Sequence, residues 1–178
     1  MAPTYSQARH LSNLNKIAEL QPAIRPLAEN LLRLSADAGI PLAIVAGHRS
    51  PEEQQALKDS GRGVTKAGAL MSYHNHGLAL DVVPLEYLPM KDWNPNGSLW
   101  DKIGVIGKQV GFEWGGDWKG FIDKPHFQFS GGTPIRELKA YYEKFKTYMP
   151  IKIEPTAGGA IIALLVLGVF MWFYREQL

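Results

Sequence analysis

Apolar residues recur at spacings of three and four near the start of the chain, which indicates one buried face of a helix. These positions are Ile17, Leu20, Ile24, Leu27, Leu31 and Leu34. Pro22 and Pro26 predict a break or a helix start within this stretch, and Gly39 predicts its end. Residues 1–16 are polar, and no apolar stretch follows a basic start, so we expect no secretory signal.

The remaining apolar patterns are shorter and alternate between strand and helix. Ser50-Pro51-Glu52-Glu53 is a capping box with proline at the first helical position, so a helix should run to about Ser60, followed by a loop over 61–68. Further strands are expected over 41–46, 78–83 and 126–129, and further helices over 98–110 and 133–146. Short connections between such elements predict an α+β fold, with flanking helices on a small, largely antiparallel sheet.

The end of the chain has a different pattern. Residues 155–174 carry no charge, and about 20 apolar residues in a helix span the roughly 30 Å core of a membrane. We therefore predict a domain over 1–146, a linker over 147–155 and a transmembrane helix over 156–175, with a buried core helix as the alternative. Lys144, Lys146 and Lys152 precede this segment and only Arg175 follows it, which would keep the domain on the cytoplasmic side.

Composition narrows the chemistry. The 178 residues carry a net charge of only +2 without a basic block, which argues against nucleic acid as the main partner. Cysteine is absent, so disulfides, a cysteine nucleophile and cysteine-ligated metals are excluded.

Two segments hold residues suited to zinc hydrolysis, 72–81 and 112–128. A catalytic zinc ion takes about three His or carboxylate ligands and leaves one position for water. His74, Asp81 and His126 could supply them, because an unpaired Asp81 between apolar strand residues would be costly to bury. His76 is an alternative ligand, since a His-x-His pair in an extended segment shares one face. Asp123 could accept the proton from water, with Glu113 as the alternative base.

The spacing of these residues resembles a known family. Ser72-x-His74-x-x-Gly77-x-Ala79-x-Asp81 with Asp123-x-x-His126 downstream is similar to the zinc peptidoglycan peptidases, which share a fold with the hedgehog signalling domain. This family contains D-alanyl-D-alanine carboxypeptidases and dipeptidases and the phage L-alanyl-D-glutamate endopeptidases. The stretches 47–54, 64–67 and 113–118 look most like the endopeptidase branch, and the resemblance covers about residues 8–146.

The resemblance implies a role for each matching position. His74, Asp81 and His126 would hold Zn²⁺, and Asp123 would be the general base. Arg49 would bind the carbonyl oxygen and stabilise the oxyanion. Ser72 and Gln54 would line the substrate cleft. Trp114 and Trp118 would either stack on substrate or belong to the core. His48 and His76 depart from the aromatic residues usual at these two positions.

The leading functional hypothesis is a zinc endopeptidase that cuts the L-Ala–D-Glu bond in the peptide stem of peptidoglycan. The alternatives are a D,D-carboxypeptidase with the same metal site and a catalytically idle, membrane-anchored cell-wall-binding protein. With the predicted anchor, the hypothesis extends to a phage protein of lysis or host infection, located in a virion membrane or the host inner membrane.

Overall fold

The apolar stripe near the N-terminus runs from the end of one helix through a short turn into a second helix, which begins where the prolines predict a break or a helix start. In the computed structural model, which describes residues 5–61, 65–89 and 97–153, α1 ends at Ala18 and α2 begins at Arg25. A short 3-10 turn over Pro22–Ile24 separates them, and Pro26 lies in the first turn of α2. Ile24 and Leu31 are fully buried, as expected for the apolar face.

The helices and strands follow the predicted order. The helices are α1 (Tyr5–Ala18), α2 (Arg25–Asp37), α3 (Pro51–Asp59), α4 (Leu99–Gln109) and α5 (Ile135–Phe145). The strands are β1 (Leu42–Ala46), β2 (Ala79–Pro84), β3 (Glu113–Trp114) and β4 (His126–Gln128). The capping box of α3 is confirmed: Ser50 Oγ accepts from the Glu53 amide at 3.1 Å, and the Glu53 carboxylate accepts from the Ser50 amide at 2.8 Å. The α+β fold is therefore as predicted.

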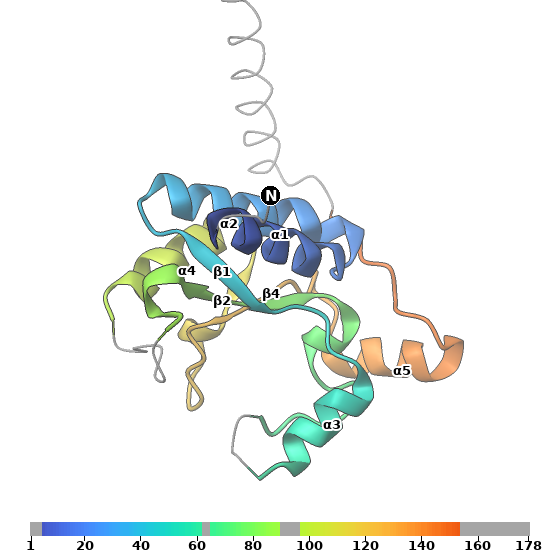
Figure 1. Cartoon of the computed structure of the whole chain (residues 1–178). Coiled ribbons are helices and arrows are strands. Elements are labelled where there is room, and N and C mark those ends of the chain that lie inside the picture. The colour runs from blue at the N-terminus through green and yellow to red at the C-terminus, as the bar shows by residue number, and fades with distance from the viewer. Residues whose placement is uncertain (1–4, 62–64, 90–96, 154–178) are drawn as a thin grey trace, which may run out of the picture.

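The four strands form one antiparallel sheet in the order β1-β2-β4-β3. Figure 1 shows α1 and α2 together along one side of the strands, with α4 next to them and α3 and α5 at the other side. The core between these layers contains Trp100, Ile103 and Phe127, all without exposed surface. Because the core packs against one face of the paired strands β2 and β4, side chains on their other face are held in fixed positions.

Two elements lie outside the sequence expectations. The polar segment from Tyr5 onwards is helical, and it contributes Asn13, whose side chain donates to the Leu42 carbonyl at 3.0 Å and accepts from the Ile44 amide at 2.9 Å. Strand β3 has only two residues and exists through its pairing with β4. Hydrophobic periodicity in the sequence predicts neither α1 nor β3.

The start of the predicted linker lies against the domain. Met149 and Ile151 pack on the core, and the side chain of Gln21 donates to the Met149 carbonyl at 3.0 Å and accepts from the Ile151 amide at 3.0 Å. These long-range bonds tie the segment after α5 to the turn between α1 and α2.

The predicted transmembrane helix has to be corrected. Within the residues that the structure describes, no helix is long and apolar enough to cross a membrane. The longest, α1, has 14 residues; at 1.5 Å per residue it extends about 21 Å, short of the roughly 30 Å required. The segment 156–175 itself lies outside the described residues. The transmembrane part of the predicted fold is therefore corrected: the fold that the structure describes contains no membrane span, and the predicted membrane partner and the location in a virion or host inner membrane are not supported.

Candidate metal centre and active-site cleft

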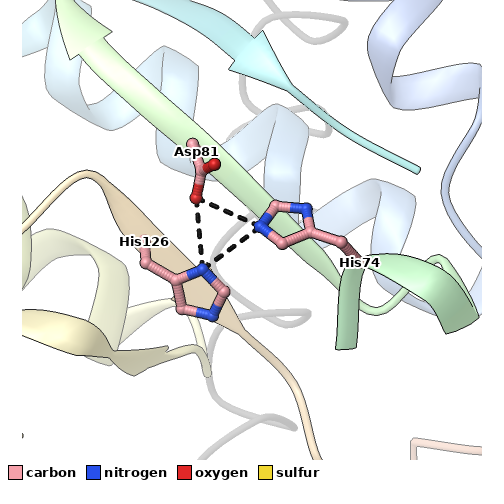
Figure 2. Close-up of side chains that lie close together, drawn as sticks. All are labelled: His74, Asp81 and His126. Carbon is pink, nitrogen blue, oxygen red and sulfur yellow. Dashed lines mark hydrogen bonds and ion pairs between the residues drawn. The ribbon is translucent and has the colours of Figure 1, made fainter. Parts of the chain in front are cut away.

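Three side chains from separate parts of the chain converge at one point (Figure 2). His74 Nε2 lies 3.2 Å from Asp81 Oδ1 and 3.2 Å from His126 Nδ1, and the Asp81 and His126 atoms are 3.1 Å apart. Both histidines are buried and Asp81 is half-buried. The structure thus brings together the three residues that the sequence proposes as ligands.

The sheet register places two of these residues. Asp81 on β2 and His126 on β4 are direct cross-strand partners, so their side chains leave the sheet on the same face. On the other side of β2, the pairing with β1 is irregular between Ile44 and Ala46, directly opposite Asp81. An irregularity of this kind bends a strand next to a site.

His74 is placed by a tight turn just before β2. Residues Tyr73–His76 form a 3-10 helix, capped by Ser72, whose hydroxyl accepts from the His74 amide at 3.4 Å. Gly77 ends the turn with φ +64°, a conformation that glycine adopts without steric cost. In a 3-10 helix residues two apart point in different directions. His76 therefore faces the Leu70 carbonyl, to which its Nε2 donates at 3.1 Å, and not the metal centre.

Hydrogen bonds behind the two histidines set which nitrogen faces the centre. Nδ1 of His74 lies 2.7 Å from the Gly47 carbonyl, which can only accept, so Nδ1 carries the proton and Nε2 presents a lone pair. Nε2 of His126 donates to Oε1 of Gln128 at 3.0 Å, which leaves Nδ1 as the lone pair of that ring. Two lone pairs and a carboxylate oxygen thus converge, an arrangement that needs a cation.

Glu113 supports this arrangement from outside. Its carboxylate accepts from Nε2 of Gln128 at 2.9 Å, and it also accepts from the amide and hydroxyl of Ser130. Because Glu113 and Gln128 are cross-strand partners, β3 holds the amide of Gln128 with its oxygen toward His126. Sequence reasoning missed Gln128, although its position two residues after His126 on one strand puts both on the same face.

The electrostatics of the centre favour positive charge. Burial acts to raise the pKa of Asp81, but the charge of His74 and the hydrogen bonds from both histidines, when their rings are protonated, outweigh it and hold that pKa well below its ordinary value. Burial acts to lower the pKa of His126, yet the hydrogen bond and charge of Asp81 raise it. The carboxylate therefore attracts either a proton on the rings or a metal ion.

The centre opens into a cleft of about 480 Å³. Asp123, Arg49 and Ser72 line it together with the three converging side chains, and so do Trp118 and Phe121. Burial and the charge of Asp81 raise the pKa of Asp123. The cleft thus combines three potential ligands, a carboxylate and a guanidinium.

Two of the predicted substrate-binding residues do not line the cleft. Gln54 is fully buried and accepts from Nη1 of Arg49 at 2.8 Å while it donates to the Ala67 carbonyl at 2.9 Å, so it holds Arg49 in place. Trp114 packs on Phe127 in the core and donates from Nε1 to the Lys124 carbonyl at 2.8 Å. Among the tryptophans that the structure describes, Trp118 lines the cleft, with its ring centre 5.0 Å from that of His126.

Known proteins with similar sequences indicate which family this chain belongs to. A family model described as D-alanyl-D-alanine carboxypeptidase matches residues 65–129. Over 129 residues the chain is 39% identical to the peptidoglycan L-alanyl-D-glutamate endopeptidase CwlK of Bacillus subtilis (strain 168), covering 62% of this chain and 74% of that protein. The chain belongs to this family of peptidoglycan peptidases. The enzyme is therefore a hydrolytic peptidase.

Further sequence and structural relatives of the peptidase are also peptidases by name. The L-alanyl-D-glutamate peptidase of Listeria phage A118 is 40% identical over 128 residues, which cover 71% of this chain and 43% of the phage protein. The L-Ala D-Glu endopeptidase ChiX of Serratia marcescens superposes with a TM-score of 0.52 at 26% identity, over 66% of this chain and 86% of that one. The LD-carboxypeptidase LdcB, at 18% identity and a TM-score of 0.50 over 74% of this chain and 71% of that one, shares the fold.

Proposed function

We propose that His74, Asp81 and His126 hold a zinc ion. Ligands about 2.0–2.1 Å from zinc at tetrahedral angles lie about 3.3 Å from one another. The three atoms here are 3.1–3.2 Å apart, a spacing that suits three ligands of one zinc ion, and all three residues line the cleft. This spacing is the single observation that carries the proposal.

Two further side chains would act on the substrate. When bound, zinc supplies Lewis-acid chemistry for hydrolysis of an amide. Asp123 would accept a proton from a water molecule in the cleft, since it is a carboxylate on the cleft wall beside the ligands. Arg49 would donate to the carbonyl oxygen of the scissile bond and stabilise its developing negative charge, a role that suits a guanidinium already held by Gln54.

We further propose that the bond cut is L-Ala–D-Glu in the peptide stem of peptidoglycan. The support is that two relatives at 39–40% identity are named for this bond, as is the structural relative ChiX. The matching family model is described as a D-alanyl-D-alanine carboxypeptidase, so release of terminal D-Ala is the competing activity. A role in phage lysis rests on one phage relative and stays a prediction.

Digestion of purified cell wall tests these proposals together. Mass analysis should find new N-terminal D-Glu, or its amidated form, and free L-Ala carboxyl ends on the glycan side. Release of single D-Ala residues would establish the carboxypeptidase activity instead. Chelation should abolish hydrolysis and zinc should restore it.

Ligand variants test the metal assignment by itself. His74→Ala, Asp81→Ala and His126→Ala should each lose zinc and activity together, whereas His76→Gln, altered at a histidine outside the centre, should keep stoichiometric zinc. Full activity in a metal-free preparation would overturn the assignment.

A further inference from the structure

A second hollow adjoins the catalytic cleft and is lined by lysines from three separate elements. Lys58 comes from α3, Lys66 from the loop that follows it and Lys139 from α5. Lys66 and Met71 line both the hollow and the cleft, so the two share a wall. A substrate that extends beyond the catalytic centre on this side meets positive charge.

Most of this charge is not neutralised by the protein. Nζ of Lys139 lies 3.6 Å from Oε1 of Glu143, which offsets one lysine in part. In the part of the chain that the structure describes, no carboxylate lies within ion-pair distance of Lys58 or Lys66. Asp59 is next to Lys58 in the sequence, but its carboxylate binds Gln55 and not Lys58: both of its oxygens accept from Nε2 of Gln55, at 2.9 and 3.0 Å.

The wall of the hollow is held by bonds between α3 and the loop. Oε1 of Gln55 accepts from the Ala69 amide at 3.1 Å, and Gln54 donates to the Ala67 carbonyl. A side chain at Gly68 would come within 3.0 Å of Oε1 of Gln55 and 3.5 Å of Nζ of Lys58. The ammonium group of Lys58 therefore lies close to the loop backbone at Gly68.

We propose that this hollow binds the free carboxylates of the substrate, and so sets the direction in which the peptide lies in the cleft. The inference rests on the proposed function. In a stem cut between L-Ala and D-Glu, D-Glu is linked through its side-chain carboxyl, so its α-carboxylate is free and lies on the D-Glu side of the scissile bond. The α-carboxyl carbon is only two bonds from the scissile nitrogen, so the α-carboxylate would face Lys66 on the shared wall, and the rest of that side of the peptide would extend toward Lys58 and Lys139, where ammonium groups pair with carboxylates.

Two peptides with the same scissile bond test the proposal, one with the free α-carboxylate of D-Glu and one with the α-amide. The wild-type enzyme should prefer the free acid in kcat/KM by about fivefold or more at low salt, the scale of a few exposed ion pairs, and the preference should shrink in high salt. The double variant Lys58→Gln/Lys66→Gln should bring this ratio close to 1, mainly through KM. Lys139→Gln should have a smaller effect because Glu143 already offsets its charge.

A matched double variant, Lys102→Gln/Lys152→Gln, removes the same charge from exposed sites elsewhere and should keep the wild-type ratio. The proposal is overturned if the wild type does not discriminate between the peptides, or if both double variants change the ratio alike. Binding of the two peptides to Asp123→Asn is measured as well, so that the hollow is tested without cleavage. Absence of cleavage at L-Ala–D-Glu by the wild type, with discrimination in binding intact, would instead remove the proposed bond specificity alone.

Discussion

Gln128 accepts a hydrogen bond from Nε2 of His126 at 3.0 Å, and this bond leaves Nδ1 of the ring to face Asp81 and His74. Gln128 can act in this way because Glu113 accepts from its amide group at 2.9 Å. The orientation of one proposed metal ligand is therefore set by two residues outside the group of three that would hold the metal.

Removal of this support should weaken metal binding. Gln128→Leu keeps a similar volume but cannot accept from His126, so we expect zinc affinity to fall about 10- to 100-fold, the usual effect of losing such a partner. Competition with a chromogenic chelator measures the affinity, and Gln109→Leu on the exposed face of α4 is the control. Equal affinity in both variants would show that Gln128 does not position His126.

The general base should be separable from the ligands. Asp123→Asn is nearly isosteric, so it should retain zinc and fold while kcat falls by roughly 10²-fold or more, the scale of a positioned acid–base group. Glu113→Gln should lower kcat much less, because Glu113 contacts Gln128 and Ser130 and does not line the cleft. Hydrolysis rates on cell wall fragments, with metal content measured in parallel, show which variant loses more activity. A larger fall in kcat for Glu113→Gln than for Asp123→Asn would identify Glu113 as the general base.

The buried His76 should make the protein less stable in acid. Burial lowers the pKa of His76, so the unfolded chain binds this proton more readily, and the free energy of unfolding should fall as pH drops below about 6.5. The loss should not exceed about 1.4 kcal/mol per pH unit for one proton. His76→Gln retains a donor for the Leu70 carbonyl and should flatten this part of the pH dependence.

Urea unfolding at several pH values between 5 and 8 measures the effect as the difference between wild type and variant. His10→Gln, at an exposed histidine of α1, is the control and should run parallel to the wild type. Parallel curves for His76→Gln as well would mean that His76 does not couple folding to protons.

The packing of α4 against β4 should depend on Gly107. A Cβ atom at this position would lie 2.1 Å from Cε1 of Phe127, which is fully buried and cannot withdraw. Gly107→Ala should therefore cost about 1–3 kcal/mol of unfolding free energy, despite the better helix propensity of alanine. Val105→Ala, at an exposed position of the same helix, should change stability far less, and equal effects in urea titrations would contradict the packing argument.

Local signals in the sequence determined most of the secondary structure. The capping box predicted the start of α3 at Pro51, and the two prolines predicted the break between α1 and α2, because these signals act within one helical turn. The apolar runs likewise predicted β1, β2 and β4 to within about two residues. The polar residues of α1 carried no such periodic signal, so this helix was not predicted. The membrane span predicted from apolar composition has no counterpart among the residues that the structure describes.

The candidate ligands were also available from the sequence, because the spacing from His74 to Asp81 and the motif at His126 are characteristic of the family. Only the tertiary structure decided how they meet. The pairing of β2 with β4 sets Asp81 opposite His126, and the 3-10 turn directs His74 toward them while it turns His76 away. The roles of Gln128 and Glu113 depend on cross-strand contacts between β3 and β4, and such contacts between distant segments leave no trace in local sequence patterns.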